Sequence, residues 1–269
     1  MNRGVRWARS CSAISWREAP DVHRLQAEGA SRLRIALPPL VLALLLAVLP
    51  HSATWFHAAW PTLSHPLYAR TSFFALTGAH LLLVVLATAL SVAIGLGLGV
   101  LATRPAGRSL LPTVRAVAVI GQTVPPVAVL AIAVPLLGFG AAPTLLALVL
   151  YGVLPVLGQT GAGLENVPPA ALHAADGMGY GRWRRLVEVE LPLAAGPIMA
   201  GVRLSAIVGV GTATIGSAVG ATTLGAPIVE GLVGNNPAYV LQGALLVGAL
   251  ALTVDTVLGA VQRRLPTQR

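Results

Sequence analysis

Six long apolar stretches, separated by polar segments, constrain this chain more than any other feature of its sequence. A helix needs about 20 mostly apolar residues to cross the hydrocarbon interior of a bilayer, and each stretch is close to that length or longer. In that interior every backbone polar group must be paired, which a helix achieves within one segment. We therefore predict an all-α membrane protein with six transmembrane helices, at residues 35–53, 78–103, 114–137, 141–161, 195–218 and 238–261.

The composition argues against a soluble globule of this size. Hydrophobic residues make up 55% of the 269 residues and charged residues only 10%, whereas soluble domains carry about 25% charged residues. The formal net charge is +9, but the arginines lie between apolar stretches rather than on one polar domain, which argues against nucleic-acid binding. Cys11 is the single cysteine, which excludes an intramolecular disulfide and a cysteine-rich metal site.

The arginines also predict how the chain lies in the membrane. Cytoplasmic loops are enriched in Lys and Arg, and with six spans the arginine groups within residues 32–34, 104–115, 182–185 and 263–269 all fall on one side. Both termini are therefore expected in the cytoplasm. The polar, arginine-rich residues 1–34 are expected to form an unstructured cytoplasmic tail, and residues 35–269 the transmembrane domain.

Two of the predicted spans carry polar side chains beside features that weaken a helix. In the third span Gln122 and Thr123 precede Pro125, and a proline removes a backbone donor and kinks a helix. The fifth span carries three hydroxyl side chains among small residues: Thr212, Thr214 and Ser217. These six residues are candidates for lining a transport pathway, and close helix packing alone is the alternative explanation.

The longest polar segment between predicted spans covers residues 162–194, on the predicted cytoplasmic side. Asn166 and the prolines that follow it suit the start of a helix, and alanines propagate the helix. Gly177, Gly179 and Gly181 then weaken it, each by about 1 kcal/mol relative to alanine. A helix this short is marginal alone in water, so it needs a docking surface on its own bundle or on a partner.

The same segment resembles the cytoplasmic signature of the membrane subunits of ATP-binding-cassette (ABC) importers. That signature is Glu-Ala-Ala, three residues, Gly, nine residues, an aliphatic residue, any residue and Leu-Pro. The matching positions here are Ala174, Ala175, Gly179, Val189, Leu191 and Pro192. His173 departs from the pattern because it stands where the family usually has glutamate.

The resemblance implies a type I ABC importer permease fold in a bacterial cytoplasmic (inner) membrane. It also implies that the segment is a coupling helix, in which residues from His173 to Trp183 contact a cytoplasmic ATPase dimer and Gly179 turns the chain sharply. The chain has no lysine and hence no Gly-x-x-x-x-Gly-Lys-Ser/Thr phosphate loop. No catalytic residue is therefore expected, and ATP and magnesium would bind the separate ATPase.

Five further phrases resemble the osmoprotectant permeases for glycine betaine, carnitine and choline, within a resemblance that covers residues 77–258. The phrases are residues 122–131, 135–140, 188–193, 198–203 and 214–228. The resemblance implies a small quaternary-amine solute, a separate extracytoplasmic solute-binding protein, and a second permease that is either another copy or a homologue. Another small solute, such as an amino acid, is the alternative within the importer class.

An ion-coupled secondary transporter is the alternative from another class, and it predicts several charges within the spans and an internal repeat of broken helices. Asp255 and Arg203 are the charges available within the spans. We expect a structural role for Asp255, which either reaches the membrane interface or pairs with Arg203. A membrane scaffold without transport, the third alternative, would need neither the proline breaks nor the loop signature. His80 is interpreted as an interfacial residue and Glu230 as a solvated loop charge.

Overall fold

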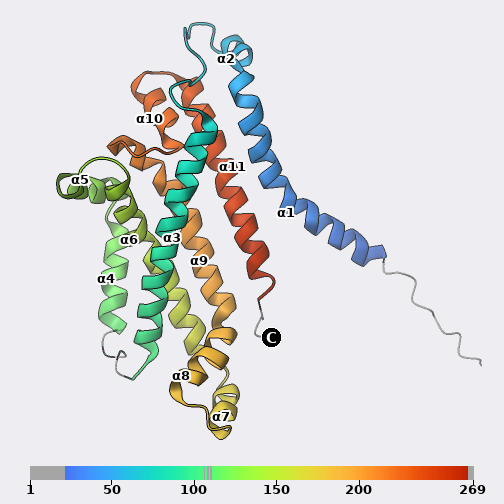
Figure 1. The fold of residues 1–269 in the computed structure, drawn as a ribbon, viewed down its shortest axis with the longest axis vertical. Helices are drawn as coiled ribbons and strands as arrows, with labels where there is room; N and C mark the ends of the chain where they lie inside the picture. The colour runs from blue at the N-terminus through green and yellow to red at the C-terminus, as the bar shows by residue number, and fades with distance from the viewer. Residues whose placement is uncertain (1–21, 106, 108, 110, 266–269) are drawn as a thin grey trace, which may run out of the picture.

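The chain forms an elongated bundle of helices in the computed structural model, which describes residues 22–105, 107, 109 and 111–265 (Figure 1). Side chains are described from residue 35 onward, apart from positions 111, 114, 115, 117, 118 and 122. The helical elements of the described residues are α1 (Val22–Val48), η1 (Leu49–His51), α2 (Ala53–Ala59), α3 (Phe73–Thr103), α4 (Leu111–Thr123), α5 (Pro126–Leu137), α6 (Ala141–Glu165), α7 (Pro169–Gly177), α8 (Arg182–Arg185), η2 (Leu186–Glu190), α9 (Leu191–Ala213), η3 (Ile215–Val219), α10 (Gly225–Val233) and α11 (Pro237–Gln262).

Four helices of the described residues are long and apolar enough to cross a membrane. They are α3, α6, α11 and the run from Arg182 to Ala213 that ends as α9. The number rises to five if Ile35–His51 and Ala53–Ala59, which meet at 77°, are taken as one bent span. The long helices lie side by side, with α3, α6 and α9 packed closely together (Figure 1). The prediction of an all-α membrane protein is therefore confirmed.

The predicted third span at residues 114–137 is wrong as a continuous helix. It is broken at Val124–Pro125 into α4 and α5, and α5 lies across the end of α4 instead of extending it (Figure 1). The cause is the Pro125–Pro126 pair, since neither residue has a backbone N–H to donate. The Val124 carbonyl freed by the break accepts a hydrogen bond from the Tyr151 hydroxyl of α6, which provides the pairing that a break needs at membrane depth.

The first and fifth spans also depart from their predicted bounds. Helix α1 begins at Val22, so residues 22–34 of the predicted unstructured tail are helical, while residues 1–21 lie outside the described part of the chain. Helix α9 ends at Ala213, and the chain continues as the 3-10 turn η3. The predicted span at 195–218 is therefore helical to Ala213 and broken beyond it.

Glycines allow α3 to approach α6 closely. A Cβ atom added to Gly99 would lie 2.6 Å from Cβ of Thr160, a fully buried residue of α6. A Cβ atom on Gly97, two residues earlier in α3, would meet nothing within 4 Å. Because real Cβ contacts are not this short, the bare backbone at position 99 sets the distance between the two helices.

We predict opposite effects for the two alanine substitutions in α3. Gly99→Ala should destabilise the bundle by about 1–3 kcal/mol, since the new methyl overpacks a tight contact. Gly97→Ala should be neutral or stabilise by up to about 1 kcal/mol, because alanine is the better helix former and the space is open. The thermal unfolding midpoint in detergent measures both, and equal midpoints for the two variants would show that the close approach is not required.

Candidate functional site

The segment between α6 and α9 folds into two short helices, α7 and α8, at the end of the bundle where α3 also ends (Figure 1). Asn166 does not start α7 as predicted. It is the C-cap residue of α6, where its side-chain amide donates to the Ala162 carbonyl at 2.8 Å. Helix α7 begins at Pro169, and the fixed φ of proline suits a first helical position without a side-chain cap.

Gly179 ends α7 in a left-handed conformation, with φ +75°. The Tyr180 N–H donates to the Ala175 carbonyl and the Gly179 N–H to the Asp176 carbonyl, both at 3.0 Å. These two bonds form a Schellman motif, which pairs carbonyl groups at the helix end and reverses the chain. The sharp turn expected at this glycine is therefore present, and the backbone conformation, rather than space, requires glycine there.

The loop has one buried side and one open side. Ala175 is 1% exposed, whereas His173 and Ala174 are exposed, as are Met178 and Trp183 at 64% and 75%. We call His173, Ala174, Met178 and Trp183, which lie where the ATPase contact was predicted, the docking face. At the other end of the signature, Leu191 packs with Leu164, Leu186 and Ala194, and Pro192 is exposed in the first turn of α9.

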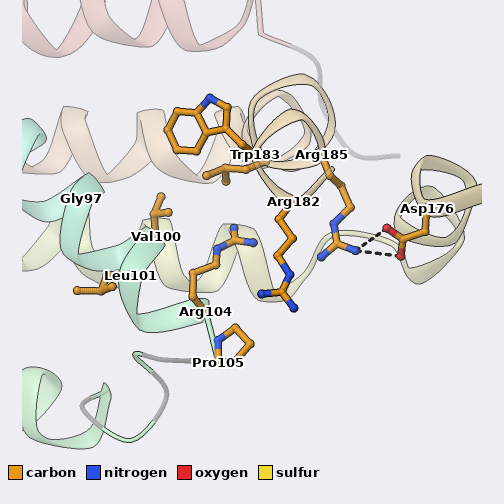
Figure 2. Close-up of a pocket in the computed structure, with 10 residues that line it drawn as sticks. Gly97, Val100, Leu101, Arg104, Pro105, Asp176, Arg182, Trp183 and Arg185 are labelled. Carbon is orange, nitrogen blue, oxygen red and sulfur yellow. Dashed lines mark hydrogen bonds and ion pairs between the residues drawn. The ribbon is translucent and has the colours of Figure 1, made fainter. Parts of the chain in front are cut away.

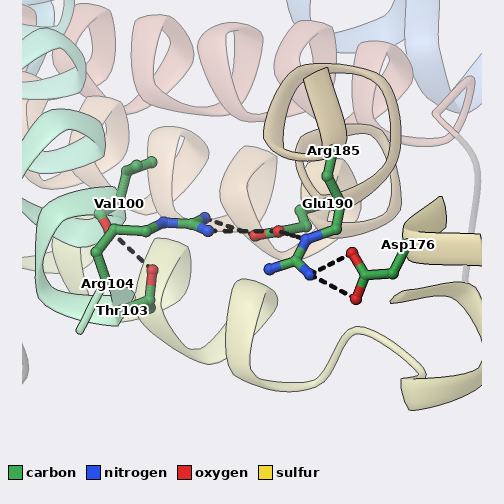
Figure 3. Close-up of polar contacts among 6 residues, drawn as sticks. All are labelled: Val100, Thr103, Arg104, Asp176, Arg185 and Glu190. Atoms are coloured by element: carbon green, nitrogen blue, oxygen red, sulfur yellow. Dashed lines mark hydrogen bonds and ion pairs between the residues drawn. The ribbon is translucent and has the colours of Figure 1, made fainter. Parts of the chain in front are cut away.

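A chain of ion pairs holds this loop to the end of α3 (Figure 3). Glu190, which is 6% exposed, lies between two arginines. It accepts from Arg104 at 2.5 and 3.3 Å, through both of its carboxylate oxygens, and from Arg185 Nε at 3.0 Å. Arg185 in turn donates to both oxygens of Asp176 in α7, at 2.7 and 2.9 Å. We call Arg104, Glu190, Arg185 and Asp176 the ionic relay.

A cleft of about 770 Å³ separates α8 from the end of α3 beside the ionic relay. Val100 and Leu101 of α3 line one wall, and Arg182 and Trp183 of α8 line the other (Figure 2). The predicted contact residue Trp183 thus borders open space instead of packing against the bundle. Beside the cleft the loop is held to α3 by charged side chains, and Val100 of α3 also packs against the apolar cluster of Leu164, Leu186 and Ala194.

The candidate pathway residues lie at two breaks, between α4 and α5 and between α9 and η3. Thr123 is exposed and donates to the Ile120 carbonyl, Thr214 donates to the Gly211 carbonyl, and the side chain of Gln122 lies outside the described residues. The hydroxyl oxygens of Ser217 and Thr223 are 2.6 Å apart and share a hydrogen bond. Thr212 is half-buried at the end of α9, and Pro125 caps α5. No hydrogen bond among the described residues joins the two groups, so their pathway role stays a prediction.

His80 was interpreted as interfacial, and that interpretation is wrong, because the residue is fully buried within α3. The backbone N–H of Leu224 donates to its Nδ1 at 3.2 Å, so Nε2 carries the proton and donates to the Val210 carbonyl at 3.1 Å. The imidazole therefore ties α3 to the end of α9 and to the segment that follows η3. The sequence offered no signal for these two hydrogen bonds, because a single histidine in an apolar stretch does not indicate which backbone groups it will contact.

Two other charged pairs follow the predictions in part. Arg203 of α9 and Asp255 of α11 form a pair, one of the two expected outcomes, with two contacts at 2.6 and 2.8 Å. Glu230 was interpreted as a solvated loop charge, but it lies in α10, pairs with Arg70 at 3.1 Å and accepts from the Tyr68 hydroxyl at 3.4 Å. Burial and the adjacent Glu230 carboxylate raise the pKa of Tyr68, so its hydroxyl remains a donor.

Comparisons with known proteins agree with this arrangement. Residues 95–266 match the family described as the binding-protein-dependent transport system inner membrane component. The osmoprotectant import permease protein OsmY of Salmonella typhimurium is 37% identical over 186 residues, covering 69% of this chain and 79% of that protein. The glycine betaine/carnitine/choline transport system permease protein OpuCB of Bacillus subtilis is 39% identical over 193 residues, covering 70% and 86%.

Solved structures show the same fold. The MetNI methionine ABC transporter in an inward-facing conformation superposes with a TM-score of 0.64 at 22% identity, over 73% of this chain and 98% of that chain. The family match covers more than half of this chain, and its long apolar helices suit a multi-pass membrane protein. The chain therefore belongs to the binding-protein-dependent transport family of inner membrane components, the permease subunits of ABC importers.

Proposed function

We propose that this chain carries a small quaternary-amine osmoprotectant, of the glycine betaine, choline and carnitine class, across the inner membrane. The main support is the similarity to two permeases, 37% and 39% identical, whose names state osmoprotectant import and glycine betaine/carnitine/choline transport. The five phrases singled out in the sequence lie between residues 122 and 228, within the matched family region. These phrases include residues at both helix breaks, and a transport pathway would run past those breaks.

The energy for transport comes from a separate ATPase dimer that seats on the docking face. Support comes from the exposure of Met178 and Trp183, two large apolar side chains at the open end of a polar loop. Large apolar side chains left open in this way are typical of a contact surface. ATP and magnesium bind the ATPase subunits in this proposal, because a chain without lysine cannot provide the phosphate-loop lysine.

Two further partners complete the proposed importer. A solute-binding protein delivers the cargo to the opposite end of the bundle, and a second permease, identical or homologous, forms the other half of the pathway. The ion-coupled alternative lacks support, since Asp255 and Arg203 are bound to each other and neither is available to carry an ion on its own.

The conformation of Gly179 gives a test of the coupling role. Gly179→Ala should reduce ATP-driven uptake, because a left-handed conformation costs an L-residue about 1–2 kcal/mol, which lowers the population of the correct turn by a factor of about 5–30. Gly179→Asn should retain more uptake, since asparagine tolerates this conformation. Uptake is measured in proteoliposomes that contain the ATPase and the solute-binding protein.

Gly181→Ala is the matched control for Gly179→Ala. Gly181 has φ −66° and a Cβ atom there would meet nothing within 4 Å, so the substitution should leave uptake at the wild-type rate. Equal loss in the Gly179→Ala and Gly181→Ala variants would refute a specific role for the left-handed turn.

The solute class is tested separately from the coupling loop. The purified solute-binding protein should bind glycine betaine, choline or carnitine in a calorimetric titration, and the reconstituted importer should take up the same compound with ATP. Binding of an amino acid and none of the three amines would overturn the solute class and leave the importer class standing.

A further inference from the structure

The ionic relay joins three parts of the chain that are far apart in sequence. Arg104 is the C-cap residue of α3, Glu190 is the last residue of η2, and Asp176 is in α7. The cleft that Arg182 and Trp183 border separates α8 from α3, and beside it Val100 of α3 packs against the apolar cluster of Leu164, Leu186 and Ala194. The Arg104–Glu190 pair is thus the ion-pair link between loop and α3 within the described residues.

The charges of the relay complement one another and the helices that carry them. Two arginines face two carboxylates, so the cluster is neutral as a whole. Arg104 follows the C-terminus of α3, where the helix dipole favours a cation. Asp176 lies in the last turn of α7, where the dipole disfavours an anion, and the double contact from Arg185 compensates for this position. Glu190 is buried, and buried charges persist in proteins when they are paired.

At its other end α3 is attached to the broken region after α9. His80 bonds there to the Val210 carbonyl and the Leu224 N–H. The helix between His80 and Arg104 is unbroken and extends about 36 Å at 1.5 Å per residue. One rigid element therefore links the loop at one end of the bundle to η3 and α10 at the other, where Thr214 and Ser217 lie.

We propose that Arg104 and Glu190 are positioning residues that fasten the coupling loop to α3, so that α3 moves with α7 when the ATPases close. The proposal rests on the proposed function, because it assumes that an ATPase moves α7. Without the fastening, ATPase closure would displace α7 and α8 toward the cleft, and ATP would be hydrolysed without opening the far end. Glu190→Gln keeps the size of the side chain and removes the charge that binds both arginines.

Spin-label distances test whether α7 and α3 move as one body. In a Cys11→Ser background, labels on Leu101→Cys in α3 and Ala170→Cys in α7 report that distance in the assembled importer, with and without ATP and vanadate. Leu101 and Ala170 are both exposed. We expect one narrow distance in both states for the otherwise wild-type protein, and a broadened distribution in the nucleotide-trapped Glu190→Gln variant.

Solute carried per ATP hydrolysed is the second readout, with glycine betaine as the probe. Losing a charged, buried contact should lower this ratio by about tenfold or more in Glu190→Gln. Asp255→Asn is the matched control, since it removes a similar two-contact arginine–carboxylate pair between α9 and α11, away from the loop. Arg104→Lys retains the positive charge but loses the two-pronged contact with Glu190, so it should give an intermediate ratio of solute to ATP. This variant serves as the test if the Glu190→Gln protein does not insert into the membrane.

The outcomes separate the relay from the proposed function. A broadened distance and a lowered ratio in the relay variants, with Asp255→Asn unchanged, support the relay. Wild-type distances and ratio in the relay variants overturn it, and so does an equal loss in Asp255→Asn, which would reflect general weakening of the bundle. If the unsubstituted importer shows no ATP hydrolysis stimulated by the solute-binding protein, the proposed function fails, and the relay fails with it.

Discussion

Every backbone N–H and C=O in the hydrocarbon interior must find a partner within the protein, and the whole structure depends on that requirement. The long helices meet it along their own length. The breaks need help from side chains on neighbouring helices, and two residues provide it. The Tyr151 hydroxyl pairs the Val124 carbonyl between α4 and α5, and His80 pairs groups of Val210 and Leu224 around the end of α9. Irregular backbone can therefore exist at these two breaks, where the pathway residues were predicted.

The same partner residues determine which helices are joined to one another. Because His80 belongs to α3, the broken region after α9 is attached to a 31-residue helix of the bundle rather than to its own neighbours alone. Arg104 attaches the opposite end of that helix to the loop between α6 and α9 through Glu190. The Schellman turn at Gly179 then reverses the chain between α7 and α8, and His173, Ala174 and Met178 are left exposed beside it. The loop between α6 and α9, helix α3 and the helix break after α9 are thus connected to one another by side-chain contacts.

Local patterns predicted what local physics controls. The lengths of the apolar stretches located α3, α6 and α11 within a few residues. The few charges within the spans made a pair between residues 203 and 255 one of two expected outcomes. Glycine at 179 indicated the sharp turn because φ +75° is unfavourable for other residues. Proline at 125 indicated a kink, but the prediction of one continuous helix for the third span was wrong. The extent of a break depends on whether a neighbouring side chain, here that of Tyr151, can pair the carbonyl that the break frees.

The sequence by itself determined the membrane environment, most of the spans, the arginine-rich end and the position of the loop turn, because hydropathy and backbone preference act over a few neighbouring residues. Only the tertiary structure decided that Glu190, at the unrestricted position of the signature, is buried between Arg104 and Arg185. It also decided that His80 lies in the core and not at the interface. Both facts depend on helices distant in sequence lying within hydrogen-bond reach, and hydropathy and motif spacing carry no record of such distances.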